Sequence, residues 1–270
     1  MTDLPLPWFG PGLDPGPSFS EFVRRSSPDL LQVPPGGDAS HLAIPHGTTI
    51  VCMRHSDGVL MAGDRRATEG YSIASRGIQK VFPADSHSGV AIAGAAGPAV
   101  EMVRLFQTEL EHYEKVEGVP LALDGKANKL SQMIRANLPM AMQGLAVVPL
   151  FAGYDLARRV GRLFRFDVTG GRYEETEFHA TGSGGVHARN FVKTRWHPGI
   201  VLDEAVDLAL EALFQAADED VATGGPDPIR GIYPVVATIE ADGFRFIPED
   251  DLADRTQRVI ARVPRGGADR

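Results

Sequence analysis

The sequence has very little cysteine and no long apolar run. Cys52 is the single cysteine among 270 residues, so the chain cannot close an intramolecular disulfide or build a cysteine-rich metal site. No stretch approaches the roughly 18 consecutive apolar residues of a membrane-spanning helix. The first residues carry no early positive charge and no apolar run of signal-peptide length. We therefore expect a cytoplasmic protein that does not associate with membranes.

Positive charge is also in short supply. Lys and Arg number 27 against 35 Asp and Glu, which gives a formal net charge of -8. The arginine pairs 65–66 and 158–159 are not part of any longer basic block. This composition offers no electrostatic reason to bind nucleic acid. The apolar content of 43% in a chain of this length is enough for one sizeable core.

Several common catalytic motifs are missing as well. The eight histidines include no His-x-x-x-His pair with a nearby glutamate, so a zinc hydrolase is unsupported. The segment 182–185 lacks the glycine two residues before Ser183 that a nucleophile elbow needs. Gly118 and Gly125 are too far apart for a phosphate-binding loop. We predict neither a metal nor a cofactor.

Proline marks the clearest boundary in the chain. Nine of the 20 prolines fall within residues 1–47, where they prevent a continuous helix or sheet ladder. Only 19–33 could form a small amphipathic turn or two there. At Thr48 the sequence changes to a β-branched run that is typical of a buried strand. We expect a leader over 1–47 and one domain over 48–270 with a frayed tail.

Within this domain, several strands follow one another, then two helices, then strands again. This grouping, in contrast to single strands alternating with single helices, indicates antiparallel sheets covered by helices, an α+β fold in four α-β-β-α layers. Pro139 should kink or split the second helix. The expected strands are 48–53, 58–63, 80–82, 89–94, 147–153, 161–168, 173–178, 233–239 and 244–247, and the expected helices are 98–116, 126–144, 186–196, 201–217 and 249–261.

One kind of nucleophile needs no histidine. A threonine at a chain terminus has its own base, an α-amine with a pKa of roughly 7.7–8. That amine exists only after the preceding peptide bond has been cut. Thr48 directly follows the expected leader, and Gly47 has the backbone freedom to let the Thr48 hydroxyl approach its carbonyl. Alone, the triplet 47–49 is much more typical of an ordinary loop-to-strand junction.

Other segments occur in an order and spacing that favour the catalytic interpretation. They are Thr48-Thr49-Ile50, Gly63-Asp64-Arg65-Arg66, Lys80 and the glycine-rich turn at Gly94. With them the chain resembles the β subunit of the proteasome core particle, in its actinobacterial form, which has the N-terminal nucleophile hydrolase fold. Further similar stretches are 110–121, 152–155, 220–227 and 230–234. The resemblance covers nearly all of residues 48–262.

This resemblance implies a role for each site residue. Thr48 would be the nucleophile, with Lys80 beside it as an ammonium held by Asp64. The N–H of Gly94 would donate to the oxyanion. The residues around the α-amine would be Ser183, Asp220 and Thr223, and the family often has serine at the last of these positions.

Each of these residues also has an ordinary interpretation. Asp64 could be a turn residue and Lys80 a solvated surface lysine. Ser183 and Thr223 lie in glycine-rich turns, where small polar residues are common. Asp220 could belong to an acidic run at a helix end. Cys52 is interpreted as a core residue rather than a nucleophile.

The resemblance also implies a substrate pocket without charged side chains, and hence cleavage after apolar or aromatic residues. Its lining residues would be Ala67, Thr68, Ile78, Ile92, Ala96 and Val100.

The implied assembly is a seven-membered ring of this subunit, stacked on a second such ring between two rings of a proteasome α subunit. An ATPase ring would deliver protein substrates, which in actinobacteria can be tagged with a ubiquitin-like modifier. Two alternatives remain at this point. One is a non-catalytic ring-building subunit, and the other is the two-component ATP-dependent threonine peptidase, which usually lacks a long leader.

Overall fold

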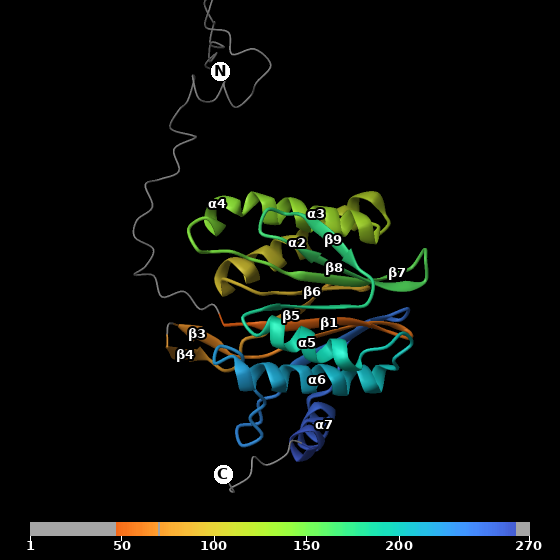
Figure 1. The fold of residues 1–270 in the computed structure, drawn as a ribbon. Helices are drawn as coiled ribbons and strands as arrows, with labels where there is room; N and C mark the ends of the chain where they lie inside the picture. The colour runs from red at the N-terminus through yellow and green to blue at the C-terminus, as the bar shows by residue number, and fades with distance from the viewer. Residues whose placement is uncertain (1–46, 70, 263–270) are drawn as a thin grey trace, which may run out of the picture. The chain divides into compact units, whose positions relative to one another are not determined.

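A computed structural model describes residues 47–69 and 71–262. All of them belong to one compact unit (Figure 1). The leader expected over 1–47 lies outside the described residues except for Gly47, as do the amphipathic turns considered over 19–33 and the last residues of the tail.

The first sheet contains the strand that follows Thr48. All neighbouring strands in it are antiparallel. Because β10 and β2 flank β1, both edges of β1 are paired and its start is fixed between two neighbours. In spatial order the strands are β10 (Phe178–Gly182), β1 (Thr49–His55), β2 (Gly58–Gly63), β11 (Val235–Glu240) and β12 (Gly243–Phe246).

The second sheet is an antiparallel meander in which neighbours in sequence are neighbours in space. A separate two-stranded hairpin consists of β3 (Ala67–Glu69) and β4 (Ser72–Ser75). The strands of the second sheet are β5 (Val81–Asp85), β6 (Ser88–Ala91), β7 (Leu150–Asp155), β8 (Val160–Phe166) and β9 (Arg172–Glu175).

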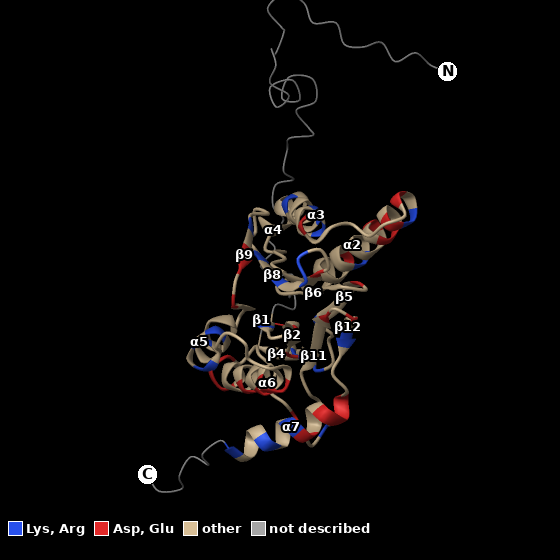
Figure 2. Ribbon diagram, turned by 90° about the vertical axis from the view of Figure 1, so that its right-hand side faces the viewer, with Lys and Arg blue, Asp and Glu red and all other residues tan. Residues whose placement is uncertain are grey.

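Helices cover the outer face of each sheet, so the domain has four layers (Figure 1). On the second sheet lie α2 (Ala96–Glu117), α3 (Leu123–Ala136) and the short α4 (Leu138–Ala141). On the first sheet lie α5 (Gly185–Arg195) and α6 (Leu202–Glu219), and α7 (Glu249–Arg262) packs against α6. The predicted α+β sandwich with flanking helices is confirmed. Figure 2 shows the layers from the side, with charged residues of both signs on the helices.

Alternation along β1 builds two of the three cores. Ile50 and Cys52 point into the core between the sheets, while Val51 and Met53 point toward α5 and α6. The third core lies between the second sheet and α2 and α3. Burial raises the pKa of the Cys52 thiol far above its ordinary value, so this cysteine is a core residue as expected.

The structure differs from the expected elements at one strand and one hairpin. The single strand over 173–178 is wrong, because the chain bends at Thr176 and Glu177 and continues as β10 in the other sheet. The hairpin of β3 and β4 was not expected at all. The helix over 126–144 is divided at Asn137, just before Pro139, as the missing N–H of proline predicts. The described part of the chain has no helix that combines the length and apolarity needed to cross a membrane.

Replacing Phe106 in α2 should destabilise the domain strongly. Its ring is fully buried and meets the ring of Phe151 edge-on, with centroids 5.9 Å apart. We expect Phe106→Ala to lower the free energy of unfolding by about 3–5 kcal/mol, because a cavity remains. Leu105→Ala, at a half-exposed position of the same helix, should cost far less. Chemical denaturation of both variants measures the difference, and equal losses would contradict it.

Stability should fall in acid partly because of His179 on β10. Burial lowers the pKa of this imidazole to about 4, with Glu175 opposing the shift. The unfolded chain therefore binds the proton more readily, and stability is lost as pH falls from about 6.5 toward 4. His179→Gln should flatten the pH dependence of the free energy of unfolding in this window. Some slope should remain, since burial also lowers the pKa of His55. An unchanged slope in the variant would contradict the assignment.

Candidate active site

Thr48 lies at the entry to β1 with almost no exposed surface. Its hydroxyl Oγ1 donates to the carbonyl oxygen of Gly47 at 2.6 Å. Its own carbonyl oxygen accepts from the backbone N–H of Ser183 at 2.8 Å and from the Ser183 hydroxyl at 3.2 Å. The Thr48 hydroxyl is therefore held directly beside the peptide bond that precedes it.

Asp64 is a fully buried carboxylate at the end of β2 that accepts four hydrogen bonds. Its Oδ1 accepts from the Nζ of Lys80 at 2.6 Å and from the backbone N–H of Thr49 at 2.7 Å. Its Oδ2 accepts from the backbone N–H groups of Arg66 and Gly224, at 2.9 and 2.8 Å. These contacts satisfy both oxygens, which stabilises the charge of a carboxylate removed from water.

Lys80 is buried just before β5, and its side chain extends toward the start of β1. Besides Asp64, Nζ donates to the carbonyl oxygens of Gly47 at 3.1 Å and Arg66 at 2.6 Å. Burial lowers the pKa of Lys80 from its ordinary value, while the Asp64 carboxylate favours the ammonium. The structure thus brings three of the predicted residues together: the Thr48 hydroxyl and the Lys80 amine share one acceptor, the Gly47 carbonyl.

The other three polar site residues gather on the opposite side of Thr48. The Thr48 N–H points at the hydroxyl of Ser183 over a long 3.4 Å contact. Thr223 is fully buried, and its hydroxyl donates to Oδ2 of Asp220 at 2.5 Å. Burial opposes ionisation of Asp220, but the nearby Ser183 hydroxyl and the hydrogen bonds from the Thr223 hydroxyl and the Ala222 N–H outweigh it and lower its pKa.

Gly94 follows β6 in a left-handed conformation with φ +105°. A β-carbon there would collide with the carbonyl oxygen of Ala146, so only glycine fits. The flanking residues Ala93 and Ala95 make the hydrogen bonds to the 146–148 segment. Gly94 is therefore a non-hydrogen-bonded partner of Val147, and its own N–H is directed away from that segment.

The predicted substrate-pocket residues are spread over β3, the segment before Lys80, the end of β6 and the first turns of α2. A β-carbon at Gly47 would lie 2.6 Å from Oγ1 of Thr68, so Thr68 borders the Thr48 junction. Ile92 donates its N–H to the carbonyl of Lys80 at 2.8 Å, which ties its strand to the site. Among these residues, Ala67 and Ile92 are buried, and the other four are half-buried.

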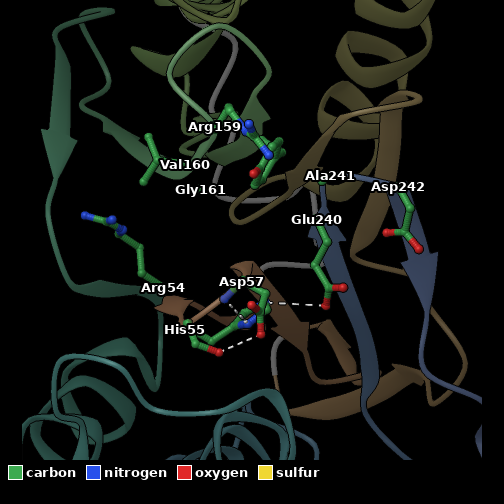
Figure 3. A pocket seen from close by; sticks show the side chains of 11 residues that line it. Arg54, His55, Asp57, Arg159, Val160, Gly161, Glu240, Ala241 and Asp242 are labelled. Carbon is green, nitrogen blue, oxygen red and sulfur yellow. Dashed lines mark hydrogen bonds and ion pairs between the residues drawn. The ribbon is translucent and has the colours of Figure 1, made fainter.

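A cavity of about 530 Å³ lies elsewhere, around the β1–β2, β7–β8 and β11–β12 turns (Figure 3). His55 and Glu240 face each other in it, with 3.9 Å between Nε2 and Oε1. None of the predicted site residues lines it. Among residues 47–69 and 71–262, no group of three His, Cys, Asp or Glu side chains is placed to hold a metal ion.

Sequence reasoning assigned no role to four residues that hold the site together, although Thr49 and Arg66 lie within the motifs. Thr49 and Gly184 contact each other, with the Gly184 N–H donating to Oγ1 of Thr49 at 3.0 Å. Arg66 and Gly224 supply backbone N–H groups to Asp64. For Thr49, a polar residue next to Thr48 in a strand predicted to be buried, the sequence did offer an indication of a role in the site. Backbone donors leave no comparable trace in a sequence, because any residue supplies the same group.

Comparison with known proteins agrees with this geometry. The family model described as "Proteasome subunit" matches residues 44–229. The chain belongs to the proteasome subunit family. Its curated relatives include proteins named "Proteasome subunit beta". The one from Acidimicrobium ferrooxidans is 58% identical, and the match covers 99% of this chain and 97% of the length of that relative. The one from Acidothermus cellulolyticus is 56% identical over 96% and 90%.

A third relative of this proteasome subunit, from Jonesia denitrificans, carries the same name and is 54% identical over 92% of this chain and 82% of its own. These matches confirm the resemblance to actinobacterial proteasome β subunits and support a hydrolase that degrades proteins within a multi-subunit core particle.

Neutralising the buried carboxylate of this proteasome subunit should be costly. In Asp64→Asn, the Lys80 ammonium loses its ionised partner inside the protein. We expect a loss of about 3–5 kcal/mol in the free energy of unfolding, the usual cost of breaking a buried ion pair.

The matched control for this change is Asp57→Asn in the exposed β1–β2 turn, which accepts only from the neighbouring Ser56 hydroxyl among the side chains described. It should cost less than about 0.5 kcal/mol. Urea denaturation of both variants measures the two losses. A tolerant Asp64→Asn would show that the pair contributes little to folding.

Proposed function

We propose that this chain is the catalytic β subunit of a proteasome core particle. It is a threonine endopeptidase that cleaves its own chain between Gly47 and Thr48. The observation that carries the proposal is the convergence on one carbonyl: Oγ1 of Thr48 and Nζ of Lys80 lie 2.6 and 3.1 Å from the Gly47 oxygen. A hydroxyl nucleophile and a cationic donor at the same peptide bond are the groups that an acyl transfer needs.

In the self-processing step, Oγ1 of Thr48 attacks the carbonyl carbon of Gly47. Negative charge develops on the carbonyl oxygen, where the Lys80 ammonium donates a hydrogen bond. The C–N bond then breaks as the Thr48 nitrogen takes up the proton lost from the hydroxyl, which leaves Gly47 attached as an ester. Water hydrolyses this ester, and the products are a Gly47 carboxylate and a Thr48 with a free amine and a free hydroxyl.

In the peptidase step, the same hydroxyl attacks a substrate carbonyl, and the freed α-amine accepts its proton. The substrate C–N bond then breaks as this proton passes to the leaving amine, and water hydrolyses the remaining ester to a carboxylate and the free Thr48 hydroxyl. An α-amine has a pKa of roughly 7.7–8, so a useful fraction is neutral near pH 7, unlike an ordinary lysine amine. Lys80, held by Asp64, provides the positive charge next to the nucleophile. The N–H of Gly94 donates to the oxyanion, and Ser183, Asp220 and Thr223 surround the amine.

The proposed domain organisation follows from this chemistry. Residues 1–47 are a propeptide that keeps the amine of Thr48 in an amide bond. Residues 48–270 form the N-terminal nucleophile hydrolase domain. We further propose that the pocket of Ala67, Thr68, Ile78, Ile92, Ala96 and Val100 receives the substrate side chain before the cut. Because none of these side chains is charged, apolar and aromatic residues should be preferred.

For the assembly, we propose two stacked rings of seven such subunits between rings of a proteasome α subunit in the cytoplasm, served by an ATPase ring that delivers unfolded, tagged or untagged protein. The intact contacts of Thr48, Asp64 and Lys80 argue against a non-catalytic ring subunit. Matches to proteins named proteasome β subunit over more than 90% of this chain argue against the two-component peptidase.

Removing one hydroxyl should abolish both proposed reactions. In Thr48→Ala we expect the full-length mass to persist and peptidase activity to fall at least about 10³-fold, since the attacking hydroxyl is removed. Intact-mass measurement and a fluorogenic apolar peptide give the two readouts in the assembled particle. Thr194→Ala, at an exposed position on α5, should leave both unchanged. Leader removal or activity persisting in Thr48→Ala would contradict the proposal.

A further inference from the structure

Thr49 connects the two sides of the site although its side chain makes no hydrogen bond to the Gly47 carbonyl or the Thr48 hydroxyl. Its backbone contacts the Lys80–Asp64 pair, since its N–H donates to Oδ1 of Asp64 at 2.7 Å. Its side chain contacts the group of Ser183, Asp220 and Thr223, since its hydroxyl lies 2.6 Å from the hydroxyl of Thr223. Thr49 and Thr223 are both fully buried.

The proton positions in this contact are fixed by counting donors. The hydroxyl of Thr223 has one proton, and that proton is directed at Oδ2 of Asp220, 2.5 Å away. The hydroxyl of Thr49 must therefore donate to Oγ1 of Thr223. Oγ1 of Thr49 in turn accepts from the N–H of Gly184 at 3.0 Å. The result is one directed chain from the Gly184 N–H through both hydroxyls to the Asp220 carboxylate.

The chain is enclosed as well as directed. A β-carbon on Gly184 would lie 2.5 Å from Oγ1 of Thr223 and 2.7 Å from Oγ1 of Thr49, so the glycine backbone packs directly against both hydroxyls. In a hydrogen-bond chain shielded from water, each link polarises the next one, and removal of one link weakens the rest. The last acceptor, Asp220, is the carboxylate beside Ser183 that the proposed mechanism places near the amine.

We propose that Thr49 is a positioning residue, whose hydroxyl orients Thr223 and through it Asp220 while its backbone orients Asp64. This role rests on the proposed function, because it matters only if the amine of Thr48 moves protons. The alternation of β1 explains the division of labour. Thr48 presents its hydroxyl to the scissile bond, and the side chain of the next residue points to the other side, toward α5 and the 220–224 loop.

The test compares Thr49→Val with Thr49→Ser in the assembled particle. Valine keeps the shape but leaves the Gly184 N–H and Thr223 without a hydroxyl partner, whereas serine keeps the donor. We expect kcat for an apolar fluorogenic peptide to fall roughly 10-fold or more in Thr49→Val, with KM within about 2-fold of wild type. Thr49→Ser should restore kcat to within about 3-fold. A residue that only packs would give the opposite order, with valine tolerated better than serine.

A double-mutant cycle separates action through Thr223 from an independent effect. If Thr49 acts through Thr223, the double variant of Thr49→Val with Thr223→Val should be no slower than Thr223→Val alone, within about 2-fold. Independent effects would multiply. Should the valine variant fail to fold, Thr49→Ala takes its place against Thr49→Ser with the same criteria.

Thr238→Val on β11 is the matched control. Thr238 is another buried strand threonine whose hydroxyl is hydrogen-bonded, here to His55 and Glu240, away from the site. This variant should keep kcat even where it lowers stability. Equal kcat in Thr49→Val and Thr49→Ser, or multiplying losses in the cycle, would overturn the positioning role. An inactive wild type, or an active Thr48→Ala, would instead contradict the proposed function.

Discussion

The buried ion pair of Lys80 and Asp64 is the interaction on which the arrangement around Thr48 depends. Two charges removed from water are tolerated only where nearly every donor and acceptor has a partner. Here that requirement draws together chain segments far apart in sequence. Asp64 collects N–H groups from the start of β1, from Arg66 and from Gly224, and Lys80 collects two carbonyls. Satisfying one buried pair therefore sets the position of the strand entry, the segment after β2 and the 220–224 loop together. The same pair also aims a cation at the peptide bond before Thr48.

Much of this could be predicted from the sequence. The β-branched run after Gly47 and the hairpin turn at 55–58 predicted β1 and β2, and the apolar spacing predicted α2 and α6. The order of strands and helices predicted the layers. Thr48, Asp64 and Lys80 were found because the family motif places them at fixed spacings, and the structure brings them into contact.

The remainder depended on information that side-chain patterns do not contain. The strand expected over 173–178 contains a bend at Thr176 and Glu177 that sends its two ends to different sheets, and only the pairing of β10 with β1 reveals this. The β3–β4 hairpin is mostly exposed and lacks an apolar alternation. The donors from Gly184 and Gly224 are backbone groups. The partnership of Thr49 with Thr223 joins residues 174 positions apart, and no local pattern encodes such a distance.

The packing around Gly47 has a consequence for how the chain marks its own cutting point. A β-carbon at this position would lie 2.6 Å from both the carbonyl oxygen of Ala222 and the hydroxyl of Thr68. Steric exclusion by the folded domain therefore restricts the residue before Thr48 to glycine. Since every other amino acid has a β-carbon, the position of the cut is encoded by the smallest residue together with the backbone that packs against it.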